Sequence, residues 1–307
     1  MPAHLTREAR ATDAGATPGK NGAMRYRVEC ELGYEVLASG GAPFVFNIEA
    51  QRGPGQEVVE EELTLSQDLP FDRFTMPESG NRYFRVLAGR GGLTVRYRAV
   101  VDLAPRRAAP ASVREMPVGR VPLEVLTHLY PSRYAESDLL QRFARREFGH
   151  LPPGHGRVAA VCNWLHDNIE YAAGSSDEHT SARDTLLQRR GVCRDFAHLA
   201  IAFCRALGIP ARFVSAYAWR LSPPDFHAVV EAWLEGPEGG AWFLFDPTRK
   251  AAADGLVRIG VGRDAAEVAF CSPWGAAECG VPKVGIQALD RPGDAASTTE
   301  AVTVAAA

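Results

Sequence analysis

The sequence lacks a cysteine framework, a long apolar run and a metal-binding loop, and each absence excludes a class of protein. Six cysteines are scattered through 307 residues without any Cys-x-x-Cys pair, so neither a disulfide scaffold nor a zinc site is indicated. No apolar stretch approaches the roughly 20 residues of a membrane helix, and Met1–Ala23 has no apolar segment typical of a signal peptide. No Asp-x-Asp-x-Asn-Gly loop marks a calcium site. We therefore expect a cytoplasmic protein with reduced thiols and without a metal or cofactor.

The chain also has no large excess of positive or negative charge. The chain has 34 basic and 37 acidic residues, which gives a net charge of −3. No general attraction to nucleic acid or to an anionic membrane is therefore expected. Hydrophobic residues make up 46% of the chain, which is ordinary for a globular protein, and the length leaves room for two domains.

The N-terminal third carries a strand pattern. Between Tyr26 and Val36, apolar residues alternate with arginine, glutamate and glycine, which is typical of a strand with one buried face. Further strands are expected at residues 44–50, 58–65, 83–88 and 93–103, separated by glycine-rich and proline-rich turns. Short strands without a helical pattern predict an antiparallel β-sandwich over residues 24–104, after a flexible start at 1–23. Residues 105–120 are predicted to be a linker.

From residue 121 the spacing of apolar residues becomes helical. The expected helices are 123–129, 137–148, 157–169, 182–189 and a helix that starts at Cys193 and stops at Gly208. The expected strands are 212–219, 226–234 and 241–246, with an extension near 266–270. Helices followed by strands predict an α+β domain over residues 121–272, with helices packed on an antiparallel sheet. Residues 273–307 are expected to form an extension that is disordered in 290–307.

Cys193 is the most informative residue of the chain. It follows a break at Gly191 and begins an alanine-rich helical run. A thiol in the first turn of a helix faces unpaired backbone N–H groups and the positive end of the helix dipole, and both favour the nucleophilic thiolate. The position predicts a catalytic cysteine, whereas Cys162 and Cys204 have the sequence context of small buried hydrophobic residues.

Two residues further along the chain complete a possible triad. His227 lies near the start of one expected strand and Asp246 near the end of the next, and the glycine-rich turn between them predicts a hairpin that brings them together. The imidazole can take a proton from Cys193, and the carboxylate can hold the imidazole in the required tautomer. His198 lies about 140° around the helix axis from Cys193, so we expect it to be a packing residue and not the base.

Five segments around these residues have a specific sequence and order. They are Thr180–Leu186 (TSARDTL), Gly191–Leu199 (GVCRDFAHL), Leu207–Ser215 (LGIPARFVS), Phe226–Ala228 (FHA) and Phe245–Thr248 (FDPT). The segments resemble the bacterial branch of the transglutaminase-like superfamily, from near Pro131 to near Phe270. The resemblance implies a papain-like core preceded by a β-sandwich, and a triad of Cys193, His227 and Asp246 that acts on amide bonds.

Acyl transfer to a thiol also needs donors for an oxyanion. The backbone N–H of Cys193 is one candidate, and the spacing leaves the second open among Tyr171, Asn168 and Trp164. The expected reaction is attack on an amide of a peptide or protein, with a thioester on Cys193 that water hydrolyses. Transamidation by a primary amine, which cross-links proteins, is one alternative. A transglutaminase-like fold that binds a partner without catalysis is another.

Overall fold

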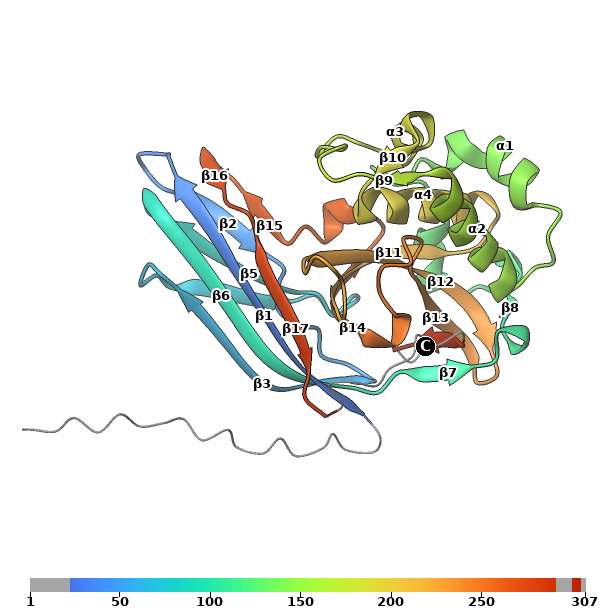
Figure 1. The fold of residues 1–307 in the computed structure, drawn as a ribbon, viewed down its shortest axis with the longest axis horizontal. Helices are drawn as coiled ribbons and strands as arrows, with labels where there is room; N and C mark the ends of the chain where they lie inside the picture. Colours follow the sequence, from blue (N-terminus) through green and yellow to red (C-terminus); the bar gives the residue numbers. More distant parts are fainter. Residues whose placement is uncertain (1–22, 291–299, 305–307) are drawn as a thin grey trace, which may run out of the picture.

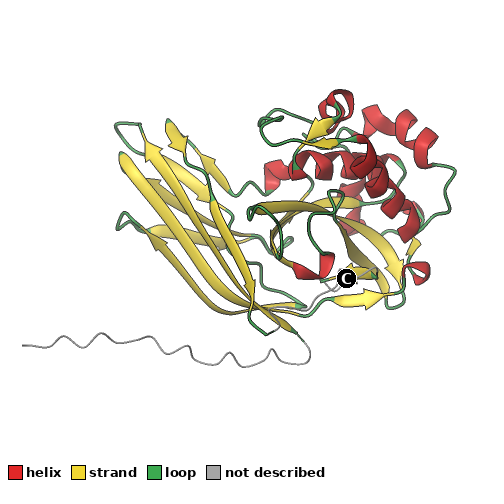
Figure 2. Cartoon of the chain, in the orientation of Figure 1, coloured by secondary structure: helices red, strands yellow, loops and turns green. Residues whose placement is uncertain are grey.

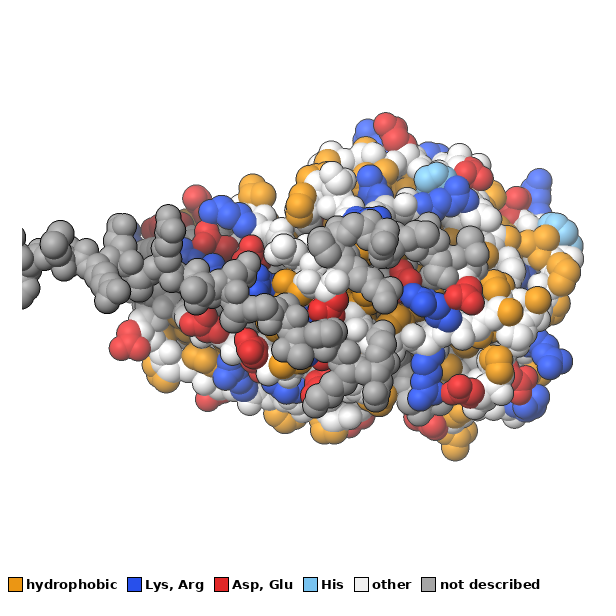
Figure 3. All heavy atoms as spheres, turned by 60° about the horizontal axis from the view of Figure 1, so that its bottom comes forward, with side chains coloured by type: hydrophobic (Ala, Val, Ile, Leu, Met, Phe, Trp, Pro, Cys, Tyr) orange, Lys and Arg blue, Asp and Glu red, His pale blue; other side chains and the backbone are white. Residues whose placement is uncertain are grey.

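The structure is a computed structural model that describes residues 23–290 and 300–304. It contains a β-sandwich and, beside it, a sheet covered by helices (Figure 1). The predicted arrangement of an all-β sandwich followed by an α+β region is thereby confirmed. Across the residues that the structure describes, no helix is both long and apolar enough to span a membrane. Acidic and basic side chains are interspersed on the face shown in Figure 3, in keeping with the small net charge.

The sandwich consists of two antiparallel sheets. The first contains β3 (Gln56–Leu65), β6 (Gly91–Leu103) and β1 (Met24–Val36), with β16 (Ala277–Cys279) and β17 (Lys283–Ala288) both paired to β1. The second contains β15 (Cys271–Pro273), β2 (Ala42–Phe46), β5 (Arg82–Ala88) and β4 (Phe71–Thr75) in that order. The alternation predicted for β1 holds, since Val28, Cys30 and Leu32 are buried while Arg27 and Glu29 are exposed. One face of β1 therefore packs into the core of the sandwich.

The segment after residue 272, which was predicted to be an extension, forms strands of the sandwich instead. Strands β15, β16 and β17, drawn in red, return to the sandwich and pair with β2 and β1 (Figure 1). The edges of β1 and β2 carry backbone N–H and C=O groups that need partners, and these short strands supply them. Residues 301–303, predicted to be disordered, form β18 (Ala301–Thr303). The rest of that prediction falls on residues 291–299 and 305–307, which lie outside the described residues.

The sheet beside the sandwich, here called the main sheet, has seven strands. Its order is β14 (Leu256–Gly262), β11 (Ala211–Ala218), β12 (Phe226–Gly236), β13 (Gly239–Phe245), β18 and β7 (Arg106–Ala108), and β8 (Arg114–Glu115) also pairs with β12. Two predictions are corrected here. The expected linker 105–120 is partly strand, because β7 and β8 pair with other strands of the main sheet. It also contains two 3-10 turns, η2 (Pro110–Ser112) and η3 (Val118–Arg120). The further strand of this sheet that was predicted near 266–270 is absent there, where η6 (Ala265–Glu267) forms a 3-10 turn. The strand that pairs with β11 is instead β14.

Helices cover one face of the main sheet (Figure 2). They are α1 (Ser137–Phe148), α2 (His155–Asn168), α3 (Ala182–Gln188) and α4 (Cys193–Ala206), and η4 (Leu123–Leu129) and η5 (Ala253–Gly255) are 3-10 turns. Between them, β9 (Glu170–Tyr171) and β10 (Arg190–Gly191) form a short parallel pair. Helix α4 contacts the other three α-helices and the main sheet, and every residue from Asp195 to Ala206 is buried. The helix is therefore held on several sides, which keeps its first residue in place.

The other face of the main sheet packs against the sandwich. Tyr217 and Ile259 of the main sheet belong to the same buried hydrophobic cluster as Tyr26 and Ile48 of the sandwich region. The Tyr217 hydroxyl also donates a hydrogen bond to the Ile48 carbonyl, at 2.8 Å. A separate cluster fills the space between the main sheet and the helices. The main sheet is thus buried on both faces, and it supports the side chains that project from its strand ends.

Candidate active site

Cys193 is the first residue of α4, and local contacts fix the start of this helix. The Asp195 carboxylate accepts a hydrogen bond of 2.8 Å from the backbone N–H of Val192. A Cβ at Gly191 would lie 2.7 Å from the Asp195 Cβ, so this position has room only for glycine. The Cys193 side chain is partly exposed, whereas Cys162 and Cys204 are buried as predicted. The thiol at the helix start is therefore accessible to a substrate.

His227 and Asp246 are brought together by the predicted hairpin of β12 and β13. His227 lies near the start of β12, and Asp246 directly follows β13. The His227 Nε2 atom is 2.9 Å from Asp246 Oδ2, and both side chains are almost fully buried. The contact leaves the other ring nitrogen, Nδ1, for Cys193.

The turn after β13 holds the Asp246 carboxylate with several donors. The backbone N–H groups of Thr248, Lys250 and Ala251 and the Thr248 hydroxyl all donate to it, at 2.7 to 3.1 Å. Burial by itself raises the pKa of Asp246, but the hydrogen bonds and the charge of His227 outweigh it and hold the pKa below its usual value. The carboxylate is therefore kept ionised and oriented toward His227. These turn donors are missing from our sequence-based predictions, although Thr248 two residues after an aspartate is a known turn signal.

The His227 ring lies between a thiol and a carboxylate. Cys193 lies near the ring and contributes to its pKa, and the Asp246 contact holds the Nε2 side of the ring. Burial lowers the pKa of the ring, but the hydrogen bonds and charges of Asp246 and Cys193 outweigh it and raise the pKa to about 10. The charged imidazolium is thus the stable form of His227 at neutral pH.

Tyr171 completes the group around Cys193. It ends β9, and its hydroxyl lies close enough to Cys193 for the backbone and side chain of that residue to affect the pKa of the hydroxyl. Burial raises the pKa of this hydroxyl to about 12, and the nearby charge of Cys193 adds to the effect. The ring is 40% exposed, and the Lys250 Nζ atom lies 4.1 Å from its centroid. The hydroxyl and the backbone N–H of Cys193 therefore lie where an oxyanion could be bound.

The other candidates for an oxyanion donor lie elsewhere. The Trp164 ring packs edge-on against Phe143 and Phe203 in the helical core. The Asn168 side chain donates its hydrogen bond to the Trp164 carbonyl. Of the three residues that the sequence left open, the structure thus brings Tyr171 to Cys193.

His198 is a packing residue, as predicted. It is fully buried in α4, its ring stacks on Tyr134 at 5.0 Å, and its Nε2 atom accepts a hydrogen bond from the Ala265 N–H. Burial lowers the pKa of the ring to about 3, so the imidazole is neutral. Within residues 23–290 and 300–304, no three histidine, cysteine or acidic side chains cluster as a metal site.

Comparisons with known protein families match two parts of the chain. The family described as "Transglutaminase-like superfamily" matches residues 141–247, a range that includes Cys193, His227 and Asp246. The family described as "Bacterial transglutaminase, N-terminal domain" matches residues 24–122, which includes strands β1 to β6 of the sandwich.

Individual relatives match over different lengths. The crystal structure of a candidate cysteine protease from Cytophaga hutchinsonii is 36% identical and has a TM-score of 0.85, covering 92% of this chain and 98% of that one. An uncharacterized protein of Mycobacterium tuberculosis is 28% identical over 291 residues, which cover 84% of this chain and 90% of the relative. An uncharacterized protein of Mycobacterium leprae is 38% identical over 117 residues, covering 36% of this chain and 42% of the relative.

Proposed function

The chain belongs to the transglutaminase-like superfamily, and from this we propose that it is a cysteine hydrolase that cleaves an amide bond with Cys193, His227 and Asp246 as its catalytic triad. The superfamily and the candidate cysteine protease from Cytophaga hutchinsonii support thiol-based amide chemistry in general. The observation that carries the finer proposal is the continuous contact from Cys193 through the His227 ring to Asp246.

The contacts suggest a role for each side chain. The Cys193 thiolate attacks the amide carbonyl, and an oxyanion forms at the carbonyl oxygen. The His227 imidazolium then gives its proton to the departing amine, and a thioester remains on Cys193. His227, now neutral, takes a proton from water, and the resulting hydroxide attacks the thioester and releases the acid. Asp246 keeps the ring oriented and stabilises its charged form throughout.

The Tyr171 hydroxyl is proposed as the second donor to the oxyanion. We expect Tyr171→Phe to lower kcat by roughly 10²-fold, because one preorganised donor to the developing charge is lost. Steady-state kinetics on any amide that the enzyme turns over measures the effect. Tyr130→Phe is the matched control, since Tyr130 is 59% exposed and outside this site. A loss of less than about twofold in Tyr171→Phe would assign the hydroxyl a structural role instead.

The contact between Cys193 and His227 predicts selective reactivity of this thiol. Cys193 should be alkylated fastest of the six cysteines at neutral pH, and His227→Ala should slow it by about tenfold because the thiolate loses its cationic partner. Brief iodoacetamide treatment followed by mass-spectrometric mapping measures both effects. Cys279, the exposed cysteine, serves as the internal control and should react equally in both proteins. Faster labelling of Cys279 or Cys271 than of Cys193 would contradict the assignment.

Hydrolysis is preferred over transamidation on physical grounds. Water is present at about 55 M, so it is the default acceptor of a thioester unless the site excludes it. The decisive experiment incubates the protein with glutamine-containing peptides, with and without a primary amine, and resolves the products by mass. Cleaved peptides or released ammonia, with no amine incorporated, would support the proposal. Incorporation of the amine would make the protein a transamidase.

A further inference from the structure

A second cavity lies away from the triad, between the sandwich and the main sheet. Its volume is about 1190 Å³. The lining comes from loops of the sandwich, from strands β11 to β14, from η4 and from the connection that leads to β15. Among the described residues that line it, Cys193, His227, Asp246 and Tyr171 do not occur. The cavity is therefore separate from the proposed catalytic site, and it is large enough to admit a small organic molecule.

The floor of the cavity contains an unequal set of buried charges. Glu231 of β12 is fully buried, and its two oxygens are bound by Arg212 of β11, at 2.6 Å, and by Arg258 of β14. Two guanidinium groups, which stay charged in proteins, thus share one carboxylate. The Arg212 guanidinium also lies over the Trp242 ring, 4.1 Å from its centroid. Arg212, Arg258 and Glu231 together therefore have one positive charge more than Glu231 can balance.

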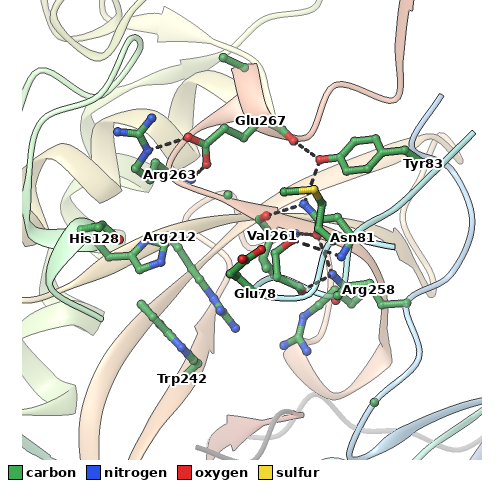
Figure 4. Close-up of a pocket in the computed structure, with 18 of the residues that line it drawn as sticks. Glu78, Asn81, Tyr83, His128, Arg212, Trp242, Arg258, Val261, Arg263 and Glu267 are labelled. Carbon is green, nitrogen blue, oxygen red and sulfur yellow. Dashed lines mark hydrogen bonds and ion pairs between the residues drawn. The ribbon is translucent and has the colours of Figure 1, made fainter. Parts of the chain in front are cut away.

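Both arginines keep donors available for a ligand. Arg212 uses its Nε atom for Glu231, and no hydrogen bond within the described part of the chain occupies its two terminal nitrogens. Arg258 uses one terminal nitrogen for Glu231, and no hydrogen bond among those residues occupies the other. The two side chains retain 13% and 9% of their surface exposed, and both are drawn at the cavity in Figure 4. An arginine pair offers donors without acceptors, which suits an oxyanion.

The pKa of a neighbouring histidine is affected by the arginines of this region. His128 of η4 lines the cavity, and burial followed by the charges of Arg212, Arg205 and Arg263 lowers its pKa to about 3. The ring is therefore neutral and adds no charge to this region. Arg263 at the rim is already paired with Glu267, at 2.6 Å.

The mouth of the cavity combines one carboxylate with apolar side chains. Glu78, in the loop between β4 and β5, is exposed and lines the same cavity (Figure 4), without an ion pair to any residue that the structure describes. Met76 and Trp274 also line the cavity and are 37% and 70% exposed. An entering anion would meet repulsion from Glu78 and apolar contact from Met76 and Trp274.

From this arrangement we propose that the cavity binds a small organic anion. Its carboxylate or phosphate group lies against Arg212 and Arg258, and its apolar body lies against Met76 and Trp274. The bound anion supplies the missing counter-charge on the floor. This site is independent of the triad, so a failure of either proposal leaves the other standing.

Three probes with the same ring test the proposal on the full chain: benzoate, phenyl phosphate and uncharged benzamide. Titration calorimetry should show saturable binding of one or both anions with a Kd in the millimolar range or below, and no binding of benzamide at about 10 mM. The tighter anion identifies the preferred head group. The indole N–H resonances of Trp242 and Trp274, assigned with phenylalanine variants, should shift on binding and locate the ligand.

Two substitutions should change the affinity in opposite directions. Arg258→Lys keeps the charge beside Glu231 but loses the planar donor pair, so the affinity should fall by about tenfold. Glu78→Gln removes the repelling carboxylate, so the affinity should rise by about threefold. Arg96→Gln is the matched control, because Arg96 is 52% exposed and pairs with Glu31 in the sandwich. Glu78 is an exposed loop residue, so its variant remains informative even where Arg258→Lys does not fold.

Two results would overturn the proposal. One is a lack of saturable binding of either anion, or binding of benzamide as tight as that of benzoate. The other is binding that neither Glu78→Gln nor Arg258→Lys changes, because the anion would then lie outside this cavity.

Discussion

Replacing Cys193 by alanine is expected to reduce every amide turnover of this protein by a factor on the order of 10⁴ to 10⁶. The reason is that, in the proposed mechanism, the thioester forms only on a thiol close to both His227 and the proposed oxyanion donors, and Cys193 lies close to His227 and Tyr171. The remaining cysteines near the helical core, Cys162 and Cys204, are buried and cannot reach a substrate. The measurement is kcat on a peptide that the wild-type protein cleaves.

The Cys193→Ala protein should fold like the wild type. Cys193 is partly exposed, and the contacts that fix the helix start belong to Gly191, Val192 and Asp195. Circular dichroism and thermal unfolding check this. Cys279→Ala, at an exposed position in β16, is the matched control and should keep full activity. Activity retained in Cys193→Ala would mean that another group is the nucleophile.

The second large effect is expected for Asp246→Asn, with a loss in kcat on the order of 10³ to 10⁴. An ionised carboxylate only accepts hydrogen bonds, and Asp246 accepts them from the turn donors while it holds His227. The NH₂ group of asparagine has no acceptor among these donors, so it turns either against the backbone N–H groups or against His227. In both cases the ring loses its counter-charge, and in the second case it also loses the hydrogen-bond acceptor that orients it.

The same substitution should change the pH dependence of the reaction. In the wild type, the His227 pKa of about 10 keeps the imidazolium at neutral pH, and kcat/KM should fall as the pH rises through about 10, where the ring of the free enzyme loses its proton. Asp246 raises this pKa, so in Asp246→Asn the fall should occur at lower pH. Thr248→Val is the matched control, because it removes one hydroxyl donor to Asp246 and keeps the carboxylate. An unchanged pH profile in Asp246→Asn would contradict the proposed pairing.

The proposed triad shows how much of a site local sequence patterns can predict. A break at Gly191 followed by an apolar helical run places Cys193 at a helix start, and these signals lie within a few residues of each other. The turn between the two strands likewise predicts the hairpin that joins His227 to Asp246. Helix α1 has the predicted bounds, 137–148, because its apolar stripe is regular and Gly149 follows its last residue.

Contacts between distant segments were decided by the tertiary structure. Tyr171 reaches Cys193 because β9 pairs with β10, and no spacing in the sequence distinguishes it from Asn168 or Trp164. The return of β15, β16 and β17 to the sandwich depends on open edges of β1 and β2, about 200 residues or more earlier in the chain.

The arginine pair of the second cavity illustrates the same division. Arg212, Glu231 and Arg258 lie on three strands and meet only because those strands are neighbours in the main sheet. The periodicity of the sequence determined which residues are buried and which elements they form, since burial of one face repeats along a helix or strand. Which elements become neighbours depends on sheet order and edge pairing, and these are properties of the whole fold that the local pattern does not contain.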